Sequence, residues 1–158
     1  HYPQLQYELV RLGIGLYGVD QEIDPIGLQT VATLKTTIAQ IRQVAATETV
    51  GYGRAGKLER DSLIATVRIG YADGYSRKLG NGTAYMLVNG HPAPVVGNVC
   101  MDMTMLDITG IPNVREGQEV EVFGPNLPVQ QIARWADTIA YEVLTGVGQR
   151  VKRIYIAE

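Results

Sequence analysis

Short segments rich in Val, Ile and Thr alternate with glycine-containing turns along most of this 158-residue chain, which contains 18 glycines. β-Branched side chains favour extended backbone, whereas glycine and asparagine favour turns. Short extended segments bury their apolar faces only by pairing into sheets. The pattern therefore predicts a mainly β domain, a barrel or a sandwich, with one or two short helices. The segments with this pattern are residues 28–45, 62–75, 82–88 and 116–124.

Three further elements complete the predicted domain. An Asn-Gly pair at 89–90 predicts a hairpin turn, and the strand that follows it is expected to run through residues 91–109. Apolar residues recur at helical spacing only in residues 128–148, which predicts a helix there. Apolar and polar residues alternate in 150–158, which predicts a closing strand.

The composition argues against several classes of partner and site. The net charge is −2 and no basic run is present, which argues against a nucleic-acid partner. No window approaches the roughly 20 apolar residues of a membrane span. The two histidines, His1 and His91, argue against a His/Cys metal site, and the single cysteine, Cys100, predicts a reducing cytoplasm. The length suits one self-supporting domain, and a chain that opens on His1 rather than methionine is expected to be a fragment.

Two glycine-rich stretches each fit two interpretations. In RLGIGLYG (11–18), bare glycine backbone would let amides approach a phosphate, but it would equally suit a strand packed closely in the core. The Walker and dinucleotide spacings are both missing. RIGYADGYSRKLGNG (68–82) fits a solvated hairpin with tyrosines over its turn. It also fits the mouth of a site in which tyrosines and Arg77 orient an anionic substrate.

Three single residues also stay open on local pattern. Tyr52 stands between two glycines, either as a lid on a turn or as a side chain held out for chemistry. Tyr141 falls on the predicted helix, where a half-buried tyrosine is ordinary. Cys100 and its methionine neighbours fall on a predicted strand, where such residues usually belong to the core. A nucleophilic cysteine would need a cation nearby, and His91 is the available partner.

Five short motifs follow one another in the order RLGIGLYG, VGYG, IGYADGY, VGNVCMDMTMLDIT and AYEVLTGVGQRVKR. From about Leu9 to Arg153, this succession resembles the C-terminal part of alanine racemase. That family uses pyridoxal 5'-phosphate (PLP) and makes D-alanine for the bacterial cell wall. Each motif is short, but five such motifs in the same order as in the family are improbable by chance.

The resemblance implies a fold, a partner and an activity. Alanine racemases resemble one another in having a PLP-binding (β/α)8 barrel followed by a mostly β C-terminal domain. They form head-to-tail homodimers, and each active site lies between one barrel and the partner's β-domain. Residues 1–18 would then be the end of the barrel, and 19–158 an alanine racemase C-terminal-like β-barrel. The full-length protein would be a cytoplasmic isomerase that interconverts L- and D-alanine for peptidoglycan synthesis.

Four residues correspond to cofactor contacts of the family. Arg11 resembles the arginine at the pyridine nitrogen. A guanidinium keeps its own proton, so that nitrogen stays largely unprotonated, and the weaker electron sink favours racemisation over transamination. Gly13 and Ile14 resemble the residues whose amides hold the phosphate, and Tyr141 resembles the tyrosine whose hydroxyl also reaches it.

Tyr52, in VGYG, resembles the catalytic tyrosine. Racemisation removes a proton from one face of Cα and delivers another to the opposite face, so the family uses two bases. One is the cofactor lysine, and the other is a tyrosine from the partner protomer. A phenol ordinarily titrates at about pH 10, so it needs nearby positive charge to act as a base. In the family that charge comes largely from a histidine and an arginine of the barrel.

Five further residues correspond to the substrate side of the family's site. Met101 and Asp102, in CMDM, resemble residues that meet the substrate carboxylate region from across the dimer interface. The methionine would contribute its backbone amide. Tyr71, Arg77 and Ile139 resemble residues of the corridor that restricts access to small amino acids.

The chain departs from the family in one important respect, because no lysine stands where the cofactor lysine would be. The barrel before RLGIG is also missing. We therefore expect the full-length protein to be a racemase, and this chain alone to be inactive and to bind PLP poorly. Two alternatives stay open: a non-catalytic interaction module that retains the fold, and a serine racemase. The parent could be a stand-alone enzyme or a fusion with a cell-wall amide ligase. The four lysines of the chain, none of which stands in the context of the cofactor lysine, are Lys35, Lys57, Lys78 and Lys152.

Overall fold

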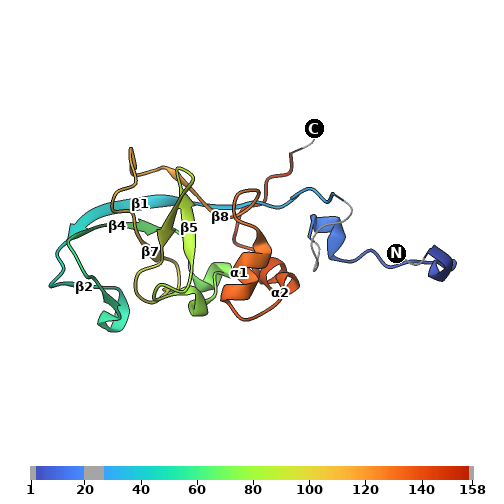
Figure 1. Cartoon of the computed structure of the whole chain (residues 1–158), viewed down its shortest axis with the longest axis horizontal. Coiled ribbons are helices and arrows are strands. Elements are labelled where there is room, and N and C mark those ends of the chain that lie inside the picture. Colours follow the sequence, from blue (N-terminus) through green and yellow to red (C-terminus); the bar gives the residue numbers. More distant parts are fainter. Residues whose placement is uncertain (1–2, 20–26, 157–158) are drawn as a thin grey trace.

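Six strands form one sheet that nearly closes on itself, and a long N-terminal arm extends from it (Figure 1). The computed structural model describes residues 3–19 and 27–156. The strand order is β6-β5-β8-β1-β4-β7, and a bridge between Val95 and Leu106 connects the two edges of the sheet. The predicted mainly β, barrel-like fold is therefore confirmed. The six strands are β1 (Leu34–Val44), β4 (Ser62–Val67), β5 (Tyr85–Val88), β6 (His91–Pro94), β7 (Thr104–Asp107) and β8 (Glu119–Phe123).

Strand β1 is central, because it pairs with β4 along one edge and with β8 along the other, both antiparallel. The alternation predicted for this segment is confirmed: Leu34 and Ile38 are buried, whereas Lys35 is exposed and forms an ion pair with Glu119 at 2.9 Å. The predicted hairpin at Asn89-Gly90 is confirmed by the β5–β6 pairing. The barrel interior is filled by large apolar residues that include Val67, Met86, Val88, Leu106, Ile108, Val120 and Val122.

The segment predicted to be one helix forms two, α1 (Val129–Trp135) and α2 (Ala140–Gly146). The chain bends between them, where Asp137 has a φ of 54°, a value that an α-helix cannot contain. Trp135 packs edge-on against Tyr85 of β5, with ring centroids 4.7 Å apart. Both helices therefore lie beside the barrel near the arm (Figure 1).

One predicted strand is wrong, and the strand predicted through residues 91–109 forms two, β6 and β7, with a non-strand segment between them. Residues 151–156 form no strand, and the apolar side chains of Ile154 and Tyr155 are exposed. Cys100 and Met101 also lie outside any strand, because β7 begins only at Thr104. Their carbonyls accept hydrogen bonds from the amides of a neighbouring turn, residues 71–72, rather than from a paired strand. Tertiary hydrogen bonds have overridden the local β preference at this position.

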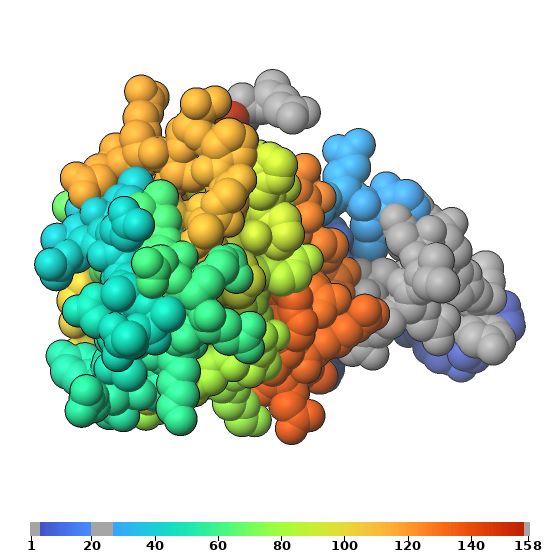
Figure 2. Space-filling model, turned by 60° about the vertical axis from the view of Figure 1, so that its left-hand side comes forward, coloured from blue at the N-terminus to red at the C-terminus, as the bar shows by residue number. Residues whose placement is uncertain are grey.

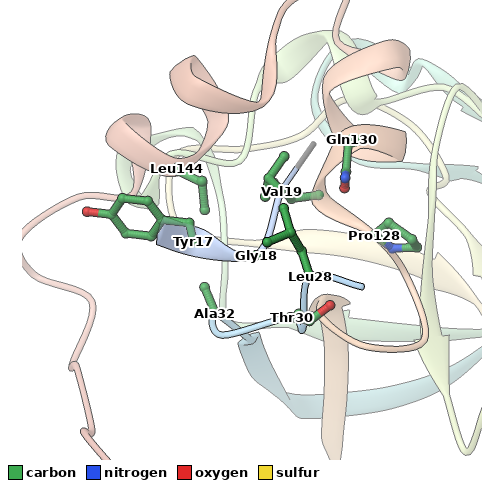
Figure 3. A pocket seen from close by; sticks show the side chains of 10 residues that line it. Tyr17, Gly18, Val19, Leu28, Thr30, Ala32, Pro128, Gln130 and Leu144 are labelled. Atoms are coloured by element: carbon green, nitrogen blue, oxygen red, sulfur yellow. The ribbon is translucent and has the colours of Figure 1, made fainter. Parts of the chain in front are cut away.

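The N-terminal arm, residues 3–19, contains only two 3-10 turns, at Pro3–Leu5 and Ile14–Tyr17. Its end and residues 28–32 face Pro128 and Leu144 across a cavity of about 240 Å³ (Figure 3). The predicted boundary after residue 18 adjoins residues 20–26, which lie outside the described part of the chain. Seven apolar or aromatic side chains of the arm are exposed: Leu5, Tyr7, Leu9, Val10, Leu12, Leu16 and Tyr17.

Candidate functional site

Tyr52 stands at the tip of a small hairpin formed by β2 (Thr49–Val50) and β3 (Gly56–Lys57). Its side chain is 75% exposed, so it does not cover its own turn. Gly51 has a φ of 77°, which lets the chain turn sharply before the tyrosine. The Asn98 side-chain amide donates to the Tyr52 carbonyl at 3.2 Å and so ties the tip to the segment before Cys100. In Figure 2 this end of the molecule, coloured teal, faces the viewer. The arrangement favours a phenol held outward over a lid on a turn.

Met101 and Asp102 form a turn that lies directly against a second turn, residues 70–74. The Tyr71 amide donates to the Cys100 carbonyl, and the Ala72 amide donates to the Met101 carbonyl, each at 3.0 Å. Met101 and Tyr71 are both well exposed. The fold therefore brings three of the predicted substrate residues, Tyr71, Met101 and Asp102, onto one surface.

Cys100 has the surroundings of a core residue. It is buried in a small cluster with Val50, Ile64 and Met105. Its thiol donates to the Asn98 carbonyl at 3.6 Å. The core interpretation of this cysteine is the one that the structure supports. Among residues 3–19 and 27–156, no three His, Cys, Asp or Glu side chains are grouped to hold a metal ion.

Arg150 forms an ion cluster with one aspartate from each of the two turns, residues 70–74 and 101–102. The Arg150 Nε donates to Asp73 Oδ1 at 2.6 Å, and its terminal nitrogen donates to the carboxylate of Asp102. Asp73 is buried, and its other oxygen accepts from the Gly70 amide at 2.9 Å. Burial raises the pKa of Asp73, but the Arg150 hydrogen bond, the Gly70 amide and the Arg150 charge together lower it below its ordinary value.

This lowered pKa predicts a pH-dependent contribution of Asp73 to folding stability. A carboxylate with a folded pKa below its unfolded pKa stabilises the fold above the unfolded value, and this stability is lost as the pH falls through the folded pKa. We expect Asp73→Asn to lower the free energy of unfolding at pH 7 by about 1–3 kcal/mol. The difference between variant and wild type should shrink below about pH 4. Urea unfolding between pH 7 and pH 3 measures it, and a difference independent of pH would contradict this origin.

A second group of predicted residues meets where the arm contacts α2. The Ile14 amide donates to the Tyr141 hydroxyl at 3.2 Å. A Cβ atom on Gly13 would lie 3.4 Å from the same hydroxyl, so a larger residue would crowd it. These residues border an open groove between the arm and the helices, and Ile139 lines the same groove. The predicted placement of Tyr141 on a helix is confirmed. Arg11 and Arg77 are both exposed, and Arg77 lies in the 3-10 turn Arg77–Leu79.

The β2–β3 hairpin that carries Tyr52 is at one end of the long axis, and the N-terminal arm extends toward the other, with α2 between them (Figure 1). Tyr52 and the Gly13–Tyr141 corner therefore belong to separate parts of the molecule.

Comparison with known proteins decides the family. The model of the family described as "Alanine racemase, C-terminal domain" matches residues 31–155, most of the chain. The chain belongs to the alanine racemase C-terminal domain family. No helix among the described residues of this racemase domain has the length and apolar character needed to cross a bilayer.

Curated alanine racemases are similar to the chain over nearly its whole length. It is 43% identical to the biosynthetic alanine racemase of Agrobacterium fabrum, over 98% of the chain and 43% of that protein. It is 47% identical to the alanine racemase of Alteromonas mediterranea, over 98% of the chain and 44% of that protein. The racemase domain therefore spans less than half the length of these relatives.

Solved structures of alanine racemases have the same fold. The biosynthetic enzyme of Pseudomonas aeruginosa matches with a TM-score of 0.85 at 40% identity, covering 92% of this chain and 41% of that one. The Bartonella henselae enzyme, solved with covalently bound pyridoxal phosphate, matches with a TM-score of 0.87 at 39% identity. That match covers 91% of this chain and 40% of that one.

Sequence reasoning missed three residues that organise this racemase domain's exposed turns. Asn98 binds the Tyr52 backbone, and Asp73 and Arg150 join the turns on which Tyr71 and Asp102 lie. Arg150 and Asp73 are 77 positions apart, and no local pattern marks such a pair. Arg150 is one of three basic residues in 150–153, and nothing in that spacing distinguishes it from Lys152 or Arg153.

Proposed function

We propose that this domain is the C-terminal part of a PLP-dependent alanine racemase that interconverts L- and D-alanine. The observation that carries the proposal is the exposed phenol of Tyr52, held outward at a hairpin tip in a member of this family. The Asn98 hydrogen bond anchors that tip to the segment that leads to Met101 and Asp102. A base and a carboxylate-facing turn are the groups that an amino-acid racemase needs on one face of its substrate.

The residues at the arm–helix groove fit the phosphate of PLP. The Ile14 amide and the Tyr141 hydroxyl converge there, and glycine at position 13 leaves the backbone open to a close approach. We propose that Gly13, Ile14 and Tyr141 bind the phosphate and that Arg11 contacts the pyridine nitrogen. When bound, PLP supplies electron withdrawal that makes the Cα proton of the amino acid acidic.

Tyr52 would act on one face of Cα. We propose that its hydroxyl takes up or delivers the proton on that face, while a lysine from another domain serves the opposite face. The Met101 amide and Asp102 would orient the substrate carboxylate region, and Tyr71, Arg77 and Ile139 would restrict access to small amino acids. Both bases are needed for net inversion, because a single base returns the proton to the face it came from.

A second protomer would complete the site. Tyr52 is on the β2–β3 hairpin at one end of the long axis, and the Gly13–Tyr141 corner is where the arm meets α2, so one copy would not place both beside one substrate. A head-to-tail homodimer supplies the tyrosine from the partner. The exposed apolar residues of the arm support its packing against a further domain, which we propose is the PLP-binding barrel. Residues 1–18 would be the end of that barrel.

The reaction would supply D-alanine for peptidoglycan in the cytoplasm. A non-catalytic interaction module with the same fold would have no need for an exposed phenol together with a phosphate-type corner. A serine racemase would require a corridor that accommodates an additional hydroxyl group. Activity with each amino acid in turn separates these alternatives.

The isolated chain is expected to be inactive even with added PLP. All four of its lysines are exposed, and the described residues that line the arm–helix groove include no lysine. We expect the full-length protein, but not residues 1–158 alone, to racemise alanine. The reaction is measured by polarimetry or with a coupled D-amino-acid oxidase. Racemisation by the isolated chain would overturn the two-domain proposal. An inactive full-length protein that binds PLP would favour the interaction module.

A further inference from the structure

Arg150 connects three segments that are far apart in the sequence. Its Nε contacts Asp73 in the 70–74 turn, and its terminal nitrogen contacts Asp102 in the 101–102 turn. Arg150 itself belongs to residues 147–156, which follow α2 and are called the C-terminal segment. The C-terminal segment is also joined to the first turn by its backbone, because the Gly148 amide donates to the Asp73 carbonyl at 3.0 Å. One guanidinium therefore lies where the two turns and the C-terminal segment meet.

The exposed fractions of the two aspartate side chains show which one is fixed by the fold and which one is held by Arg150. The Asp73 side chain is 13% exposed and is also bound by the Gly70 amide, so it is a rigid anchor. The Asp102 side chain is 55% exposed. A carboxylate in that position would otherwise sample several rotamers in water. The planar guanidinium transmits the fixed position of Asp73 to Asp102.

We propose that Arg150 is a positioning residue for substrate binding: by holding Asp102 it fixes the 101–102 turn, so that the Met101 backbone amide is oriented to donate to the substrate carboxylate. This inference rests on the proposed racemase function. It assigns Arg150 no contact with the substrate, because Arg150 acts through Asp102. The carboxylate of alanine is not changed by the reaction, so its contacts contribute equally to ground state and transition state. Loss of Arg150 should therefore weaken substrate binding more than it slows the chemical step.

A purely structural role for Arg150 is the competing explanation, and the chain provides a control for it. Arg153, three residues later, donates to the carbonyls of Val147, Gly148 and Val151, and each of these acceptors belongs to the C-terminal segment. Arg153→Gln therefore loosens the same segment without removing the contact between Arg150 and Asp102. The two arginines separate anchoring of the segment from orientation of the substrate turn.

The test compares Arg150→Gln with Arg153→Gln in the full-length protein. For Arg150→Gln we expect the KM for alanine to rise about tenfold, the size of one lost charge-assisted hydrogen bond, while kcat changes less than about threefold. For Arg153→Gln we expect KM within about twofold of wild type. Hydrogen–deuterium exchange of the protein without substrate should accelerate in residues 98–106 for Arg150→Gln only.

Each outcome decides the proposal. Equal changes in KM and exchange for both variants would mean that Arg150 only anchors the C-terminal segment, and so would a KM for Arg150→Gln that matches wild type. If Arg150→Gln does not fold, Arg150→Lys is used: it keeps the charge but cannot bridge two carboxylates in one plane, so it should still raise KM and exchange. If the wild-type protein racemises nothing, the proposed function fails, and the exchange measurement still tests the link between Arg150 and the 101–102 turn.

Discussion

The full-length protein carrying Tyr52→Phe should lose about 10²- to 10⁴-fold of its alanine racemase activity in both directions, the usual contribution of one positioned acid–base group. The substitution removes only a hydroxyl from a side chain that is 75% exposed, so folding should be unaffected. Cofactor absorbance should therefore be preserved. Racemisation is measured from each enantiomer with a coupled assay, at saturating and at low alanine.

A second readout separates loss of one base from loss of the whole site. In D₂O the variant should still exchange the Cα proton of one enantiomer, because the base on the other face remains, but it should not invert it. Tyr155→Phe is the matched control, since this tyrosine is also highly exposed and lies in the C-terminal segment. Racemisation near the wild-type rate by Tyr52→Phe, in both directions, would remove Tyr52 from the mechanism.

The parts of the fold that could be predicted from sequence were those that local chemistry dictates. The alternation around Ile38 gave β1 correctly, and the Asn89-Gly90 pair gave the β5–β6 hairpin, since both signals act over a few residues. The single predicted helix failed at Asp137, where the apolar spacing continues but the backbone turns to a positive φ. Periodicity reports which side chains are buried, and it does not report a break between two helices that bury the same face.

The errors at the site have a different physical origin. Cys100 and Met101 have the composition of a strand, but their carbonyls accept hydrogen bonds from the amides of residues 71–72, some 30 positions earlier. The family resemblance named Met101, Asp102 and Tyr71 one at a time, without predicting that their turns are joined through Arg150. Long-range polar contacts of this kind depend on the folded topology, so they become visible only in three dimensions.

Gly70→Ala is expected to destabilise the fold strongly, because the methyl would be added between the two turns of the site. A Cβ atom at position 70 would lie 2.3 Å from the Cys100 carbonyl oxygen and 2.4 Å from the Met101 carbonyl oxygen. Both contacts are to backbone, so no side chain can rotate away, and the two turns must separate. The φ of Gly70 is −151°, which any residue adopts, so the cost comes from this close approach alone.

We expect Gly70→Ala to lower the free energy of unfolding by about 3 kcal/mol or more, the upper range for overpacking. Urea unfolding of the chain, followed by Trp135 fluorescence, measures this loss. Gly146→Ala is the control, because a Cβ there meets nothing within 4 Å and the residue ends α2. That variant should be as stable as wild type or more stable by about 0.5–1 kcal/mol, because alanine favours helix.

Separation of the turns also displaces Met101 from Tyr71, so a folded Gly70→Ala protein should bind alanine more weakly. If Gly70→Ala were as stable as Gly146→Ala, the close contact between the two turns would not exist in solution.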